Sequence, residues 1–283
     1  MDLSFDDTGG SGGTEHDGTS VEAAIGDVAF LTRSGHRVSA LVALAERPRS
    51  RAALRELTGV SASTIGRTLG EFERRNWIRR DGHEYEATQL GAFVAAAMRE
   101  VTRQVATERK LRDAWQWLPT AADGFSVEMC ADAVVSVAEP ADPYRPVQRF
   151  GSLLAETDRF RFVGSDLALL EPCKDEFRQR VLDGVRTEII DPPSVARHVL
   201  SAYPEHCEAP LKSGNLTVRV HDDVPSYGLA LFDDRIGIVG YSTDSGTVQV
   251  LIDTDTTAAR KWAEATYASY RSDSRPLSVT LPA

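Results

Sequence analysis

Residues 50–88, SRAALRELTGVSASTIGRTLGEFERRNWIRRDGHEYEAT, contain the local signals that predict the fold of the first part of the chain. Ser50 is a favourable helix N-cap, and the apolar spacing after it predicts a short helix. The TGVS segment predicts a tight turn in which Gly59 is left-handed and Ser61 caps a second helix, residues 62–76. The following Asp-Gly pair between two short extended runs is typical of a β-hairpin. Helix, glycine turn, helix and hairpin are the order of a winged helix-turn-helix, which we expect over residues 21–90.

A longer helix is predicted after the hairpin. Thr88 is a candidate N-cap, and apolar residues at three- and four-residue spacing continue to about Leu118. Such a stripe packs on a partner helix in many dimers, so residues 91–120 are predicted to be the linker and dimerisation helix of a homodimer. Gln104 and Glu108 interrupt the stripe, and the alternative is that it packs on the protein's own domains.

Residues 121–283 alternate short β-rich runs with helical runs, which predicts an α/β domain that senses an effector or dimerises. A hairpin turn is expected at Asp233-Asp234, and the acids Asp253 and Asp255 are expected in a solvated turn. Strands are expected at 133–137, 160–163, 187–190, 216–221, 228–232, 236–240 and 248–252. Helices are expected at 147–156, 174–182, 194–203 and 257–271.

The composition is that of an ordinary globular protein, with 42% hydrophobic and 26% charged residues. Residues 1–20 contain almost nothing apolar and predict a disordered acidic tail.

No apolar run approaches the roughly 18–20 residues of a membrane span, and the chain does not open on a signal peptide, so we expect a cytoplasmic protein without a membrane partner. The three cysteines are far apart and His206-Cys207 lacks a second ligand pair, so neither a metal site nor a cofactor is expected.

The net charge of −10 is unevenly distributed. Residues 1–25 carry six acids and no Lys or Arg, whereas residues 26–90 carry eleven Arg against eight acids. This asymmetry indicates an anionic partner for the early segment. The chain also contains 28 Arg against 4 Lys, which resembles the acidic, lysine-poor proteins of salt-accumulating halophilic archaea.

The winged helix-turn-helix predicts which residues meet double-stranded DNA. The second helix of the pair lies in the major groove, where Arg67 can grip a guanine edge with two hydrogen bonds. Hydroxyls near its start reach bases or phosphates, and basic residues of the hairpin and the preceding helix meet the DNA backbone. The predicted DNA-binding residues are Arg49, Arg51, Ser61, Ser63, Thr64, Arg67, Thr68, Arg79, Arg80 and His83.

Two stretches resemble known families. Residues from about 25 to 95, through TGVSASTIGRTLGEFERRNW, the hairpin and TQLG, resemble the N-terminal winged helix of haloarchaeal transcriptional regulators. The segments ADPYRPVQRF (141–150), VPSYGLALFDDRIGIVGY (224–241) and DTDTTAARKWAEATYASYR (253–271) resemble the effector domain of the methanogenesis-regulatory-protein middle-domain family. That family is similar to the TrmB-type sugar-responsive regulators, and its domains resemble a phospholipase D-like fold.

The resemblance implies a sequence-specific transcriptional regulator that binds a promoter or operator. Enzymes of the phospholipase D-like fold use an HxKxxxxD motif, and no histidine of this chain is followed two residues later by lysine. The resemblance therefore implies the fold without that chemistry. GxGxxG, GxxxxGK and HExxH motifs are also absent, and the GxSxG pattern occurs only within the glycine-rich run GGSGG (9–13) of the expected disordered tail, so no enzyme is expected.

A small-molecule effector of the C-terminal domain is the remaining expected partner. Ligands of α/β folds favour strand ends, and position alone points to Tyr144, Arg145, Ser165, Asp166, Tyr227 and Tyr241. Two alternatives stay open: a winged helix that binds protein without touching DNA, and a phosphoester hydrolase in the C-terminal domain.

Overall fold

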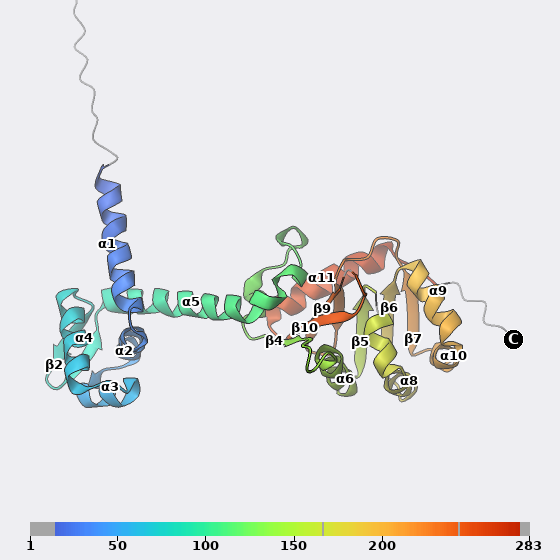
Figure 1. Ribbon diagram of the computed structural model, residues 1–283, viewed down its shortest axis with the longest axis horizontal. Helices are drawn as coiled ribbons and strands as arrows, with labels where there is room; N and C mark the ends of the chain where they lie inside the picture. Colours follow the sequence, from blue (N-terminus) through green and yellow to red (C-terminus); the bar gives the residue numbers. More distant parts are fainter. Residues whose placement is uncertain (1–14, 166, 243, 278–283) are drawn as a thin grey trace, which may run out of the picture. The chain divides into compact units, whose positions relative to one another are not determined.

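The structure is a computed structural model that describes residues 15–165, 167–242 and 244–277. The chain forms two compact units, the N-terminal unit (residues 1–103) and the C-terminal unit (residues 104–283) (Figure 1). Residues 1–14 of the predicted acidic tail lie outside the described residues, and residues 15–20 belong to the first helix instead of the tail. Extending an existing helix gains one hydrogen bond for each residue fixed, which is far easier than nucleating one.

The N-terminal unit contains the helices and the hairpin that the sequence predicts. β3 pairs antiparallel with β2 and, on its other side, with the two-residue strand β1, which the sequence did not predict. The elements are α1 (Glu15–Thr32), α2 (Gly35–Glu46), β1 (Arg49–Ser50), α3 (Arg51–Thr58), α4 (Ala62–Arg74), β2 (Ile78–Asp81), β3 (Glu84–Ala87) and the first part of α5 (Gln89–Leu111).

Local signals fix the ends of α3 and α4. The Ser50 hydroxyl accepts a hydrogen bond from the Ala53 N–H at 3.2 Å, and the Ser61 hydroxyl accepts one from the Thr64 N–H at 3.2 Å. Gly59 ends α3 with φ +70°, a left-handed conformation that glycine adopts without a steric penalty. The predicted caps and glycine turn are confirmed.

Apolar residues of α1 to α5 and of the hairpin form one core. Phe72 of α4 is fully buried, with its ring centroid 6.1 Å from that of Phe30 and 5.9 Å from that of Trp77. Ile65 and Leu69 occupy the same side of α4 and are buried with it. The inner side of α4 therefore anchors the helix, and its opposite side is left to solvent.

The start of α5 is packed so closely on Trp77 that one position requires glycine. A Cβ at Gly91 would lie 1.8 Å from the Trp77 carbonyl oxygen. That carbonyl accepts the Thr88 N–H at 2.9 Å, and the Thr88 hydroxyl accepts the Gly91 N–H at 3.1 Å. The predicted cap at Thr88 is confirmed, and it holds the first turn of α5 against Trp77.

Gly91→Ala is expected to lower the free energy of unfolding by at least about 1 kcal/mol, because the backbone must shift to admit the methyl group. Gly26→Ala in α1 is the matched control, since its added Cβ meets nothing within 4 Å. That change should be neutral or stabilising by up to about 1 kcal/mol. Urea unfolding followed by circular dichroism measures both variants, and equal midpoints would show that α5 and Trp77 are not in close contact.

The long helix is shorter than predicted. α5 ends at Leu111, and a 3-10 helix, η1 (Arg112–Trp117), follows it instead of an α-helix to Leu118. Leu111 and Ala114 are both buried in the C-terminal unit, and three residues per turn place positions i and i+3 on one side of a 3-10 helix. Tertiary packing thus overrides the continued helical spacing.

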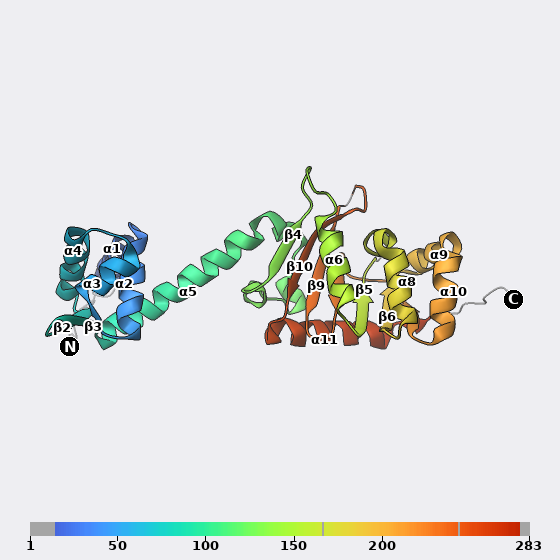
Figure 2. The ribbon, with the colours of Figure 1, turned by 90° about the horizontal axis from the view of Figure 1, so that it is seen from below.

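The C-terminal unit is built on one eight-stranded mixed sheet with the strand order β11-β7-β6-β5-β8-β9-β10-β4 (Figure 2). β6 pairs in parallel with both β5 and β7, and every other pair of neighbouring strands in this sheet is antiparallel. The strands are β4 (Val134–Val137), β5 (Arg159–Val163), β6 (Arg186–Asp191), β7 (Leu216–Val220), β8 (Gly228–Leu231), β9 (Ile236–Tyr241), β10 (Val248–Thr254) and β11 (Arg275–Pro276). All seven predicted strands are present.

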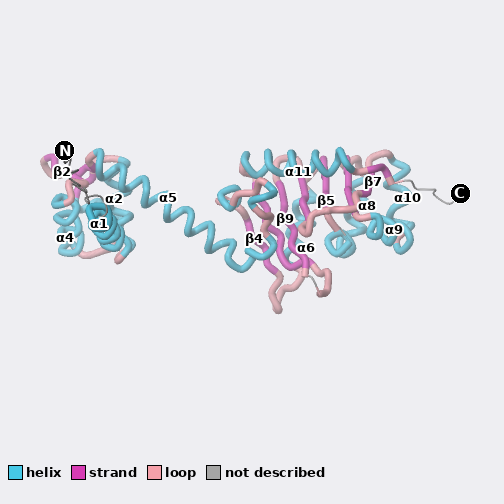
Figure 3. Tube along the Cα trace, turned by 90° about the horizontal axis from the view of Figure 1, so that it is seen from above, coloured by secondary structure: helices cyan, strands magenta, loops and turns pink. Residues whose placement is uncertain are grey.

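Helices cover both faces of this sheet (Figures 2 and 3). α11 packs Trp262 and Tyr267 on one face, and α6 packs Phe150 and Leu154 on the other, where α8 also lies. The four predicted helices are confirmed within two residues at each end. The helices are α6 (Arg145–Ala155), α7 (Leu167–Leu170), α8 (Lys174–Leu182), α9 (Pro193–Ala202), α10 (Pro204–Ser213) and α11 (Thr257–Asp273), with 3-10 helices η2 (Ala121–Asp123), η3 (Val127–Cys130) and η4 (Glu171–Cys173).

Two features of this unit differ from expectation. α10 was not predicted, because it begins at Pro204 and contains Pro210; proline is well tolerated in the first turn of a helix but breaks the helical pattern further in. Asp253 was expected in a solvated turn, but it lies in β10 with no exposed surface. Its carboxylate accepts hydrogen bonds from Arg149 and Arg235, which compensates its burial.

Candidate nucleic-acid interface

The outer side of α4 carries a row of polar and basic residues. Ser63, Arg67 and Arg74 are four and seven residues apart, which places them on one side of the helix, opposite Phe72. Ser63 and Arg67 are exposed, and Arg67 makes no hydrogen bond or ion pair with any residue that the structure describes. Arg74 is exposed and pairs with Glu71. Arg74 was not among the predicted residues, although its seven-residue spacing from Arg67 was a usable signal.

A cluster of hydroxyls lies at the first turn of α4. The Ser61 hydroxyl is 2.9 Å from the hydroxyls of both Ser63 and Thr64. Arg51 lies beside them, because its guanidinium donates to the Ala62 carbonyl and occupies the space that a side chain at Gly66 would fill. The predicted residues at this turn are therefore brought together with one arginine of α3.

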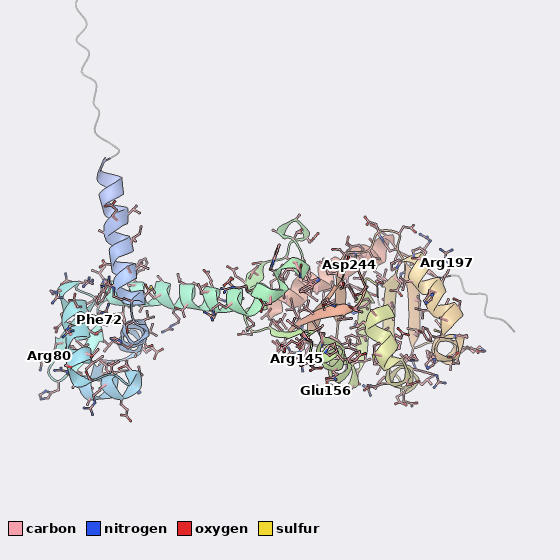
Figure 4. The ribbon with its side chains drawn as sticks, viewed as in Figure 1. Phe72, Arg80, Arg145, Glu156, Arg197 and Asp244 are labelled. Carbon is pink, nitrogen blue, oxygen red and sulfur yellow. The ribbon has the colours of Figure 1, made fainter. Side chains whose placement is uncertain are left out.

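The predicted hairpin residues lie on β2 and at the turn that joins it to β3. Arg79 is 72% exposed, and its Nε donates to the Glu86 carboxylate at 2.5 Å. The Arg80 Nε donates to the Gly82 carbonyl at 2.9 Å, and Figure 4 shows Arg80 at the outer edge of this unit. His83 is exposed next to Gly82, whose φ of +58° makes the tight turn.

Two predicted residues are not on this surface. Thr68 is 3% exposed, so the prediction that it faces outward is wrong. It follows Ile65 by three residues and precedes Phe72 by four, which places it on the inner side of α4. The Arg49 side chain is 16% exposed, and its Nε donates to the Ala43 carbonyl at 3.2 Å. Arg49 therefore has a structural partner inside the unit.

Thr68 takes part in a hydrogen-bonded link between α4 and the start of α2. Its hydroxyl is 3.0 Å from His36 Nε2, and the Ser34 hydroxyl is 2.8 Å from His36 Nδ1. Burial lowers the pKa of His36 below its ordinary value, and the neighbouring Arg37 lowers it further. His36 is therefore neutral at neutral pH, and the neutral ring makes the hydrogen bonds to Ser34 and Thr68.

The N-terminal unit should lose stability as the pH falls through the ordinary histidine range. The unfolded chain binds a proton at His36 near pH 6.5, whereas the folded chain resists it, so the free energy of unfolding falls below that pH and is fully restored above it. Urea midpoints at pH 5.5 and 7.5 measure the difference, which should shrink in His36→Gln. His83→Gln, at an exposed histidine, is the control and should keep the full difference. An unchanged pH dependence in His36→Gln would show that His36 is not the group whose protonation destabilises the unit.

The five candidate effector residues that the structure describes do not form one site. Tyr144 and Ser165 line a hollow of about 780 Å³, whereas Tyr227 and Tyr241 line another of about 430 Å³, and Gln249 borders both. Arg145 lines neither hollow, and its guanidinium lies 3.3 Å from the Glu139 carboxylate. Asp166 lies outside the described residues.

Within the part of the chain that the structure describes, no helix is long and apolar enough to cross a membrane. The same residues contain no group of three or more His, Cys, Asp or Glu side chains arranged to hold a metal ion.

Two family models match parts of the chain. Residues 143–273 match the middle domain of the methanogenesis regulatory protein FilR1, which confirms the resemblance of the C-terminal unit to that family. Residues 25–110 match the HVO_A0261 N-terminal domain. No curated protein matches the chain significantly.

Several solved structures align loosely with the chain. TrmBL2, an archaeal chromatin protein, is 14% identical with a TM-score of 0.40, covering 86% of this chain and 94% of its own. A putative transcriptional regulator of the IclR family from Rhodococcus sp. is 16% identical with a TM-score of 0.20, covering 85% of this chain and 92% of its own. The methyltransferase RosA from Streptomyces davawensis is 17% identical with a TM-score of 0.26, covering 74% of this chain and 67% of its own. With TM-scores this low, no conclusion about this chain rests on these alignments.

Proposed function

We propose that this protein is a sequence-specific DNA-binding transcriptional regulator whose N-terminal unit is a winged helix-turn-helix. α3 and α4 are the helix pair, α4 is the recognition helix, and β2 and β3 are the wing. The methanogenesis regulatory protein after which the matching middle domain is named supports a regulatory role for the C-terminal unit.

The observation that carries the proposal is the outer side of α4. Its inner side is anchored by Ile65, Leu69 and Phe72, while Ser63 and Arg67 are exposed, and Arg67 has no partner among the described residues. An arginine on a rigid helix with its guanidinium free is what bidentate recognition of a guanine requires. The exposed Arg79 and Arg80 of the wing suit contacts with phosphates or the minor groove.

Binding of the full-length protein to a mixed-sequence duplex of about 30 base pairs, measured over a KCl series, tests the proposal. Each phosphate neutralised by a basic side chain lowers the slope of log K against log [KCl] by about 0.9, so we expect a slope of several units. Circular dichroism at each salt concentration confirms that the protein is folded. A folded protein that retains no duplex at any of these concentrations would overturn the proposal and favour a protein-binding winged helix.

We further propose that the protein is a homodimer joined through α1 and α5. Phe93 is 76% exposed, and Leu90 and Val101 lie on the same side of α5 and are also exposed. α1 exposes Val21, Ile25 and Val28 at spacings of four and three residues. Helix sides of this kind are buried by partner helices in dimers, and a two-fold dimer would present two copies of α4 to an inverted repeat.

Light scattering of the full-length protein tests this dimer. Phe93→Glu should convert a dimer into a monomer, because it introduces a charge into the apolar side of α5. Ala92→Glu is the matched control, since Ala92 is exposed and, at about 100° per residue, lies on a different side of the same helix. A wild-type protein that is monomeric, or a dimer unaffected by Phe93→Glu, would contradict the dimer proposed here.

We also propose that a small-molecule effector binds the C-terminal unit and shifts the equilibrium between DNA-binding arrangements. The unit would be a phospholipase D-like domain that has lost the His-Lys motif and carries out no catalysis. A purified protein that hydrolyses phosphodiesters or phosphomonoesters would contradict the absence of catalysis.

The acidic, lysine-poor composition supports the proposal that the protein works in the salt-rich cytoplasm of a haloarchaeon. The protein should then unfold when KCl is dialysed away.

A further inference from the structure

A cavity lies between the sheet and the helices α8, α9 and α10. It is distinct from the two hollows described above, although Glu171 borders both this cavity and the hollow of Tyr144. The cavity offers about 80 Å³ to the centres of water-sized groups. One water needs roughly 10–15 Å³ on this measure, so the cavity has room for about five to eight non-hydrogen atoms.

The walls of this cavity are mainly apolar. Ile189, Ala196 and Leu216 are buried and come from β6, α9 and β7, while Phe177 and Leu200 add apolar surface from α8 and α9. Apolar walls hold water poorly, and they gain dispersion contacts with any apolar group that fills the space between them. A ligand with an apolar body makes those contacts.

The polar groups around the cavity have an excess of negative charge. Two carboxylates, Glu171 and Asp191, line it together with one lysine, Lys174. His206 also lines it, with its ring nitrogens 2.8 Å from the Asp175 carboxylate and 3.1 Å from the Glu205 carboxylate. A ligand carboxylate would be repelled by this set of groups, whereas an ammonium would be attracted.

Asp191 is the group best placed to select such a cation. It is the last residue of β6, it is 3% exposed, and it lies two residues from the buried wall residue Ile189, on the same face of the sheet. A carboxylate offers about four lone-pair positions, so it can accept a ligand N–H in addition to any protein partner. Salt screens buried charge pairs much less than exposed ones, so the attraction persists in molar KCl.

We propose that this cavity binds a small apolar amine, with the apolar body between α8, α9 and the sheet and the ammonium on Asp191. The site deepens the proposed effector control, on which its regulatory meaning rests, by naming a place and a ligand class. Binding of the amine is measured without DNA, so a failure of this proposal is distinguishable from a failure of DNA binding.

Calorimetric titration of the full-length protein with cyclohexylamine, and with cyclohexanecarboxylate as the anion of the same ring, tests the ligand class. We expect one amine per chain and no binding of the carboxylate. Alkylation of Cys207, which lines the cavity, should be slowed by the amine, whereas alkylation of Cys173, which does not line it, should be unchanged. Equal binding of amine and carboxylate, no binding of the amine, or unprotected Cys207 would each overturn the proposal.

Variants test the role of each wall. Asp191→Asn removes the charge at constant size and should weaken amine binding at least tenfold, whereas Asp234→Asn, in an exposed turn, should leave it unchanged. Ala196→Leu fills the cavity and should abolish binding. An Asp191→Asn protein that binds the amine as tightly as the wild type would overturn the assignment of Asp191. If Asp191→Asn does not fold, the wild-type titrations and Ala196→Leu decide the outcome.

Discussion

Replacing Asp253 with alanine is expected to lower the free energy of unfolding by about 3–5 kcal/mol, because it removes the buried carboxylate that two guanidinium groups share. Arg149 donates Nε and Nη2 to the two carboxylate oxygens at 2.9 and 2.8 Å, and Arg235 donates Nη1 at 2.8 Å. The Asp253 side chain has no exposed surface, and its hydrogen bonds raise the pKa of Arg149 above the ordinary value. Both arginines are partly buried, and Arg149 would lose both of these hydrogen bonds, while Arg235 would keep only its pair with the exposed Asp255.

Asp255 provides the control for this prediction. It pairs with the same Arg235 at 2.9 Å, but its side chain is 55% exposed. Asp255→Ala should therefore cost less than about 1 kcal/mol. Denaturant unfolding of both variants in the same KCl concentration measures the difference. Equal losses would contradict the view that Asp253 is the buried centre of this ion-pair group.

Arg67→Ala is expected to weaken binding to a cognate duplex about 5- to 150-fold, which corresponds to the loss of about 1–3 kcal/mol for one bidentate contact with a base. The fold should be unaffected, since Arg67 is exposed and has no partner among the described residues. Because the contact is with a base, the variant should also lose its preference at one position of the DNA site.

Arg109→Ala separates this effect from the mere loss of a positive charge. Arg109 is an exposed arginine of α5 outside the helix pair and the hairpin. Its replacement should change affinity little and leave the preferred sequence unaltered. Titration of the three proteins against the cognate duplex and its single-base variants measures both properties. Wild-type affinity and specificity in Arg67→Ala would show that α4 is not the recognition helix.

The elements of the N-terminal unit could be predicted because their ends are coded locally. Ser50, Gly59, Ser61 and Thr88 act through their own side chains or backbone freedom, and all four do what the sequence indicates. The error at Thr68 was one of helix phase, since its spacing from Ile65 already indicated the inner side. The pairing of Arg49 with the Ala43 carbonyl depends on tertiary structure, which no local pattern reveals.

The C-terminal unit shows where sequence patterns become insufficient. Its strands were predictable because they are short apolar runs, but the burial of Asp253 depends on Arg149, which is more than a hundred residues away in the chain. Such a pairing has no periodicity to detect. The cavity under α9 and α10 was missed for a related reason, since the prolines of α10 hid the helix that forms one of its walls.

Sequence-specific DNA binding is tested by selecting randomised duplexes with the full-length protein in molar KCl and sequencing those that are retained. We expect an enriched inverted repeat whose half-site centres are about 10–10.5 base pairs apart, or a multiple of that distance. Retention of the starting pool without any enriched sequence, by a protein shown to be folded and dimeric, would contradict it.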